Sequence, residues 1–135
     1  MDENLIDIRR KKEKLLKEML IMPQMPRDVL HLKNSSELEN LANKYPNTVI
    51  IIDCSAVWCG PCQWFSPIFE KLQTELGNDF IFANVDVDEA RDIAMQFAIA
   101  VVPTTIFLKG GKMINQLKGA LPYEKMKELL LRFKS

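Results

Sequence analysis

Apolar residues recur with different periods along this chain, and the period identifies most of its elements. Residues 4–20 carry apolar residues spaced for roughly one side of a helix, namely Leu5, Ile8, Leu15, Met19 and Leu20. Lys12 interrupts that stripe. The segment IMPQMPRD follows, and its two prolines, which lack a backbone donor, predict an extended linker. We therefore expect residues 1–26 to form a helical extension and linker, and residues 27–135 to form the main domain.

Strand-like and helix-like segments alternate beyond the linker. VLHL is short and apolar, and SSELENLANKY begins with a serine that can cap a helix, with Glu37 or Glu39 supporting its first turn. NTVIIIDCSA is a β-branched run without polar alternation, which is typical of a central strand covered on both faces. A long helix is predicted over residues 60–76, followed by the strand DFIFANVDVD and the helix EARDIAMQFAI.

The pattern changes after Pro103. TTIFLKGGKMINQL predicts two strands joined at Gly110 and Gly111, and LPYEKMKELLLRF predicts a closing helix with Pro122 near its first turn. The resulting order is β-α-β-α-β-α-β-β-α. It predicts an α/β domain whose mixed sheet has parallel strands first, an antiparallel hairpin last and helices on both faces.

Length and charge narrow the class of protein. A chain of 135 residues is long enough for one domain with a real core. Its 18 basic and 18 acidic residues balance, so nothing indicates nucleic acid or an anionic membrane as a partner. No window is apolar for the roughly 18 residues of a membrane helix, and the mixed charges at the start argue against a signal or transit peptide. We expect a cytoplasmic protein.

The segment VWCGPCQW, residues 57–64, places two cysteines where a strand gives way to a helix. A helix N-terminus offers unpaired N–H groups and about half a positive charge, which favours a thiolate at Cys59. Cys62 lies one turn deeper, so it is adjacent and less exposed. This spacing lets one sulfur attack a partner disulfide while the second resolves the mixed disulfide. Pro61, after Gly60, fits the first helical turn and stiffens the loop.

The remaining cysteine and the histidine provide an alternative reading, a metal site. Zinc usually takes four ligands, and only Cys54 and His31 remain to complete such a set. His31 falls in a short strand, where a packed or surface histidine is expected. Cys54 follows Asp53 in a strand, so its side chain points to the opposite face and is expected to be a small buried hydrophobe. The redox interpretation is favoured, with no metal.

WCGPC after a strand, Asp53 six residues before Cys59, and VPT at 102–104 resemble the thioredoxin family over about residues 29–134. The resemblance implies a thioredoxin fold with a five-stranded mixed sheet, and a dithiol–disulfide exchange activity. Cys59 matches the attacking cysteine and Cys62 the resolving cysteine. Their redox-active disulfide is then the only redox group expected, with no other cofactor.

The resemblance also assigns supporting roles. Trp58 matches a tryptophan covering the site, Pro103 a cis-proline facing the disulfide, and Gly119 a glycine lining the substrate groove. A cis bond would leave the Val102 backbone free to pair with an extended substrate segment. Each residue also has a simpler structural interpretation. Trp58 could be a core residue, Pro103 a trans proline at the start of a strand, and Gly119 a residue that only satisfies a turn.

Asp53 ends an apolar strand, so burial should raise its pKa and let it exchange a proton with Cys62. The alternative is a buried acid that only satisfies hydrogen bonds. Two positions depart from the family's pattern. Gln63 stands where relatives often carry a basic residue, and Phe82 falls about where some relatives have a lysine near the buried acid.

Three functions remain open from the sequence. The leading one is a reductase of protein disulfides that is recharged by a separate thioredoxin reductase, because the chain has no nucleotide-binding glycine-rich loop. The second is a disulfide oxidase or isomerase, and the third is a non-catalytic thioredoxin-fold binding subunit. Residues 4–20 are either solvated or packed on their own domain, or they dock onto a partner or a second copy.

Overall fold

Helices and strands alternate through the computed structural model, which describes residues 3–21 and 24–134. Helix α1 (Glu3–Ile21) comes first. The elements that follow are β1 (Leu30–His31), α2 (Ser35–Lys44), β2 (Val49–Ser55), α3 (Gly60–Leu76), β3 (Phe80–Asp86), α4 (Arg91–Gln96), β4 (Thr104–Lys109), β5 (Lys112–Lys118) and α5 (Tyr123–Leu131). The predicted order of strands and helices is therefore confirmed.

The sheet has five strands in the order β1-β3-β2-β4-β5. β3 pairs in parallel with both β1 and β2, whereas β4 is antiparallel to β2 and to β5. The β4–β5 hairpin turns at Gly110 and Gly111, whose φ angles of 59° and 79° favour glycine. The expected mixed sheet, with its antiparallel hairpin last, is confirmed.

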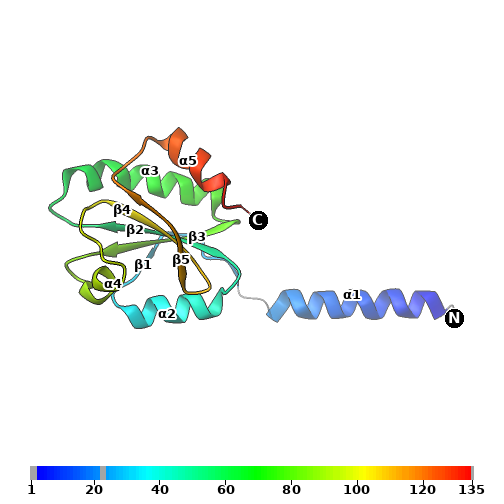
Figure 1. Ribbon diagram of the computed structural model, residues 1–135. Coiled ribbons are helices and arrows are strands. Elements are labelled where there is room, and N and C mark those ends of the chain that lie inside the picture. Colours follow the sequence, from blue (N-terminus) through cyan, green and yellow to red (C-terminus); the bar gives the residue numbers. More distant parts are fainter. Residues whose placement is uncertain (1–2, 22–23, 135) are drawn as a thin grey trace.

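Helices cover both faces of this sheet, with α2 and α4 on one side and α3 and α5 on the other (Figure 1). The side chains of β2 alternate between the two faces, and six of its seven residues are buried. Ile50, Ile52 and Cys54 join the core beneath α2 and α4. Val49 and Ile51 join a second core, rich in phenylalanine, beneath α3 and α5.

Two helix ends differ from the sequence prediction. Asn34, rather than a serine, caps α2, because its side-chain oxygen accepts the N–H of Glu37 at 2.9 Å. Helix α4 is shorter than the segment EARDIAMQFAI, since Ala98 adopts a left-handed φ of 51° soon after Gln96 and ends the helix.

The apolar stripe of helix α1 is exposed to solvent. Leu5, Ile8 and Leu15 are all more than half exposed, and Figure 1 draws α1 apart from the sheet and its covering helices. The side chains of Met19 and Leu20 lie outside the described residues. Among the described residues, no helix combines the length and apolar character needed to cross a membrane. The division into residues 1–26 and 27–135 stays a prediction.

Candidate active site

The cysteine pair lies at the first turn of α3. Cys59 is the N-cap residue, with an extended backbone, and its sulfur accepts the N–H of Cys62 at 3.2 Å. The two sulfurs are joined as a disulfide across a Cα–Cα distance of 5.3 Å. Pro61 occupies the first turn, where its missing N–H costs no hydrogen bond. The sequence-based position of both cysteines relative to the helix is therefore correct.

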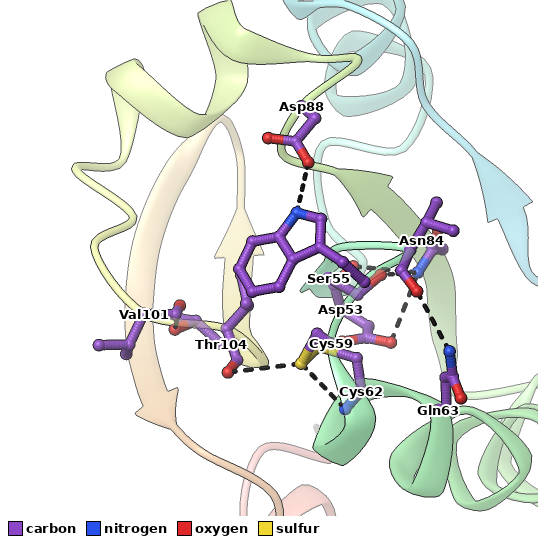
Figure 2. Close-up of a disulfide and its surroundings, with 12 residues drawn as sticks. Asp53, Ser55, Cys59, Cys62, Gln63, Asn84, Asp88, Val101 and Thr104 are labelled. Carbon is purple, nitrogen blue, oxygen red and sulfur yellow. Dashed lines mark hydrogen bonds between the residues drawn. A yellow bond between two sulfur atoms is a disulfide. The ribbon is translucent and has the colours of Figure 1, made fainter.

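The residues around the cysteine pair differ in their exposure to solvent. Both cysteines are buried, while Gly60 and Pro61 between them are exposed. Trp58 is 72% exposed, and its indole N–H donates to Asp88 at 2.8 Å. Figure 2 shows Asp88, the acceptor of this hydrogen bond, on the same side of the molecule as the disulfide. An indole held at one end by a carboxylate offers a fixed apolar surface next to the reacting sulfur.

The segment before β4 approaches the disulfide from the other side. The Val102–Pro103 peptide bond is cis, as the family resemblance implies. The carbonyl oxygen of Val102 lies 3.8 Å from the sulfur of Cys59. Gly119, in a left-handed conformation with φ 92°, donates its N–H to the Pro103 carbonyl at 2.8 Å. Val102 thus lies directly against Cys59, and Gly119 is held next to the same segment through Pro103.

Asp53 lies beneath the pair, near the end of β2. It is only 2% exposed, and burial raises its pKa to about 7, while a hydrogen bond from Asn84 lowers it in part. A cleft of about 510 Å³ is lined by both Asp53 and Cys62. An acid with a pKa of about 7 exchanges protons readily near neutral pH, and it opens onto the same space as the second sulfur.

Asn84 is the site residue that sequence reasoning missed. Its amide N–H groups lie 3.4 Å from a carboxylate oxygen of Asp53, 3.3 Å from the Asp53 carbonyl and 3.0 Å from the Ser55 hydroxyl. The prediction placed Phe82 near this acid and is wrong: Phe82 pairs with Ile51, and its ring is buried in the phenylalanine-rich core. Counting two residues further along the strand, in register with Asp53, identifies Asn84.

The other residues singled out from the sequence lie elsewhere. His31 is half exposed at the rim of the cleft, 3.3 Å from Glu89. Cys54 is fully buried, and burial together with the neighbouring Asp53 charge raises the pKa of its thiol to about 12. The Gln63 side chain donates to the Val57 carbonyl at 3.1 Å, so it braces the cysteine turn. The structure does not bring Cys54 and His31 together with the cysteine pair.

Two sulfurs that share a helix N-terminus can interconvert between a dithiol and a disulfide without another redox group. The fold and the site therefore define a thiol–disulfide oxidoreductase. A family model described as Thioredoxin matches residues 28–132 of the chain, which belongs to the thioredoxin family and reduces protein disulfides.

Individual relatives agree with this assignment. A thioredoxin from Mycoplasmoides gallisepticum is 39% identical over 100 residues, covering 74% of this chain and 97% of that protein. A thioredoxin from Coprinus comatus is 45% identical over 92 residues, or 67% of this chain and 85% of that one. The X-ray structure of Fasciola hepatica thioredoxin matches with a TM-score of 0.74 and 34% identity, covering 78% of this chain and 100% of that chain.

Proposed function

We propose that this chain is a general disulfide reductase of the cytoplasm, carrying electrons from a separate thioredoxin reductase to disulfide-containing proteins. The Cys59–Cys62 couple is its only redox group, and it requires no metal or other cofactor. One observation supports this most strongly: the Cys59 sulfur caps α3 and lies 3.8 Å from the Val102 carbonyl. A sulfur so positioned faces both an anion-stabilising helix end and a backbone edge that can pair with a substrate.

The first step is attack by Cys59. In the reduced protein its thiolate, stabilised at the helix N-terminus, attacks one sulfur of the substrate disulfide. A mixed disulfide forms, and the other substrate sulfur leaves as a thiolate. The exposed Trp58 ring supplies apolar docking area, while Val102 and Gly119 offer backbone groups to an extended substrate segment.

The second step is resolution by Cys62. Asp53 accepts the proton of the Cys62 thiol, and the resulting thiolate attacks the Cys59 sulfur. The bond between the two cysteines forms as the bond from Cys59 to the substrate breaks. The substrate thus gains two electrons, and the cysteine pair is left as the disulfide. A reductase then returns it to the dithiol.

Turnover of insulin disulfides tests this function. Reduced protein with a dithiol supply should cleave them, and Cys59→Ser should lower the rate to that of the dithiol alone. Cys62→Ser should instead accumulate a mixed disulfide, which non-reducing gel electrophoresis reveals as an adduct. Cys54→Ala is the matched control, because it removes the third cysteine, and it should retain full turnover. Normal turnover by Cys59→Ser would refute the nucleophile.

Two other functions have distinct signatures. A disulfide oxidase or isomerase needs a more oxidising couple, so a redox titration of Cys59–Cys62 against glutathione separates it from a reductase. A non-catalytic binding subunit would keep its cellular role after Cys59→Ser. The Gly60–Pro61 dipeptide and the expected reducing compartment favour the reductase.

Residues 4–20 are proposed as a docking helix for a partner or a second copy. The support is the exposure of Leu5, Ile8 and Leu15 on α1. Sedimentation of the full chain and of a chain lacking residues 1–26 tests this directly. An unchanged monomer with full activity after truncation would remove the docking role.

A further inference from the structure

A row of polar residues crosses the centre of the sheet where its apolar core ends. Asp53 on β2 pairs in register with Asn84 on β3 and with Thr105 on β4. The neighbouring row on this face lies two residues earlier on β2 and β3, and two residues later on the antiparallel β4. It consists of Ile51, Phe82 and Phe107, which all belong to the core beneath α3 and α5. Because side chains alternate along a strand, the polar row lies on that same face, close to the cysteine pair.

Asn84 holds one side of the Asp53 carboxylate. Its amide lies within hydrogen-bond distance of the Asp53 Oδ2 and of the Ser55 hydroxyl. Figure 2 shows the Asp53 carboxylate between Asn84 and the cysteine pair. Since Asn84 is neutral, it orients the carboxylate without adding a charge that would fix Asp53 in its ionised form.

The other oxygen of the carboxylate and the hydroxyl of the paired residue on β4 both lack a hydrogen-bond partner. Asp53 Oδ1 and Thr105 Oγ1 are both buried, and neither has a hydrogen-bond partner within the described part of the chain. Their residues are direct partners in the β2–β4 register. Two unpaired buried oxygens on paired residues are costly unless a water molecule joins them. Oδ1 is thus left available to take a proton.

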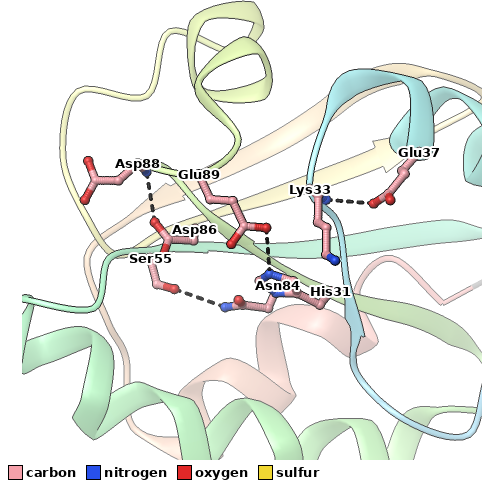
Figure 3. A network of polar contacts seen from close by, with 8 residues as sticks. All are labelled: His31, Lys33, Glu37, Ser55, Asn84, Asp86, Asp88 and Glu89. Carbon is pink, nitrogen blue, oxygen red and sulfur yellow. Dashed lines mark hydrogen bonds and ion pairs between the residues drawn. The ribbon is translucent and has the colours of Figure 1, made fainter.

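The cleft connects this row to solvent and to the second sulfur. Its titratable lining comes from β1 with His31, from β3 with Asp86 and from α3 with Cys62 and Glu70. Cys54 adjoins Asp53 on β2 itself, and the in-register residue of β4, Thr105, does not titrate. Figure 3 shows Ser55 and Asn84 joined by their hydrogen bond, with Asp86 beside Ser55 and His31 beside Asn84.

We propose that Asn84 and Thr105 are positioning residues for disulfide exchange, which act through Asp53. Asn84 fixes Oδ2, so that Oδ1 faces the Thr105 hydroxyl and the cleft shared with Cys62. This inference rests on the proposed function, because it concerns the resolving step alone. In that step the Cys62 proton passes to Asp53, the Cys62 sulfur bonds to the Cys59 sulfur, and the substrate leaves as a thiolate carrying the released electron pair. Asp53 then returns the proton to that thiolate or to solvent.

Stopped-flow reaction of the reduced chain with one equivalent of 5,5′-dithiobis(2-nitrobenzoate) separates the two steps. Cys59 attack releases the first thionitrobenzoate, and Cys62 attack releases the second. For the native chain the second phase should speed up as pH rises, with a midpoint near 7, where Asp53 ionises. Failure of the first phase would contradict the proposed function, whereas the second phase reports on the positioning residues.

Substitutions at Asn84 should shift that midpoint in both directions. Asn84→Ala removes a donor to the carboxylate and should raise the midpoint by about one pH unit. Asn84→Asp adds a like charge and should raise it further, by roughly two units. Asn84→Lys adds an opposite charge and should lower it by about one unit. General damage to the fold would not produce this signed order.

The hydroxyl at position 105 has its own test. Thr105→Val keeps the shape but removes the hydroxyl, and should raise the midpoint by about one pH unit. Thr105→Ser keeps the hydroxyl and should restore the native midpoint. Asn115→Ala is the matched control, since Asn115 is a half-buried asparagine on β5 outside the cleft. Unshifted midpoints for Asn84→Ala and Thr105→Val, or a shift with Asn115→Ala, would overturn the proposal.

Discussion

Asp53 and Cys54 are consecutive residues near the end of β2, but they lie on opposite faces of the sheet and in different surroundings. Asp53 and Cys54 are both buried, and burial raises the pKa of each, to about 7 and about 12 respectively. Cys54 lies between Val85 and Thr104 in a closed core. Asp53 lies between Asn84 and Thr105, and borders a cleft that reaches Cys62. Burial raises the pKa on both faces, but only the carboxylate on the face beneath α3 opens onto a cleft that Cys62 also lines.

The comparison also explains why one chain keeps three cysteines with different chemistry. Cys59 and Cys62 meet at a helix N-terminus, where a thiolate is favoured. Cys54 is one position past Asp53, on a face without such a helix end, and the high pKa keeps its thiol protonated. Reactivity therefore follows the electrostatic surroundings of each sulfur rather than the residue type.

The largest expected effect on stability comes from placing a carboxylate on the face of β2 that carries Cys54, where the core is closed. Cys54→Asp places an acid in a core that offers neither a cleft nor an amide donor like Asn84. We expect it to lower the free energy of unfolding by roughly 5 kcal/mol or more at neutral pH, which is comparable to the whole stability of a domain. Urea denaturation measures this. A loss below about 1 kcal/mol would show that the two faces do not differ as described.

Neutralising Asp53 should have the opposite effect and raise the free energy of unfolding at neutral pH. Its pKa rises from an ordinary 3.8 to about 7 on folding, so the folded state binds more protons between these values. Native stability therefore falls as pH rises from about 4 to 7, by at most about 4 kcal/mol. Asp53→Asn should remove this loss, so it stabilises the protein at pH 8 and leaves its stability at pH 3.5 nearly unchanged. Denaturation at both pH values tests the sign, and equal effects would contradict it.

The smallest effect is expected from removing the third thiol. Cys54→Ala deletes one buried sulfur and leaves a small cavity, which should cost about 1–2 kcal/mol of unfolding free energy. Thermal denaturation measures that cost. The pH profile of disulfide exchange should be the same as that of the native chain, and a displaced profile would give Cys54 a part in the reaction.

Much of the fold could be predicted because local signals agreed with the tertiary structure. The β-branched run of β2, the glycine pair of the β4–β5 hairpin and the proline at the start of α3 each favour the observed element. The two helix ends that were predicted wrongly were decided by single neighbouring residues. Asn34 displaced the expected serine cap of α2, and Ala98 ended α4 early by adopting a left-handed backbone that an alanine seldom takes.

The site residues also fall into those that the sequence could locate and those that it could not. The cysteine pair could be located from sequence because the capping position and helix spacing are local properties. Asn84 could not, because its contact with Asp53 depends on the register between β2 and β3, and a two-residue error placed Phe82 there instead. Thr105 was overlooked for the same reason, since its position opposite Asp53 comes from the antiparallel pairing with β4.

The sequence alone located the two sulfurs at the N-terminus of a helix, because the residues involved lie within one turn. It also showed that an acid follows the apolar run of a buried strand. Only the tertiary structure decided which oxygens, hydroxyls and amides surround that acid. The physical reason is that strand register joins residues far apart in the chain, and a shift of one position turns every side chain to the other face.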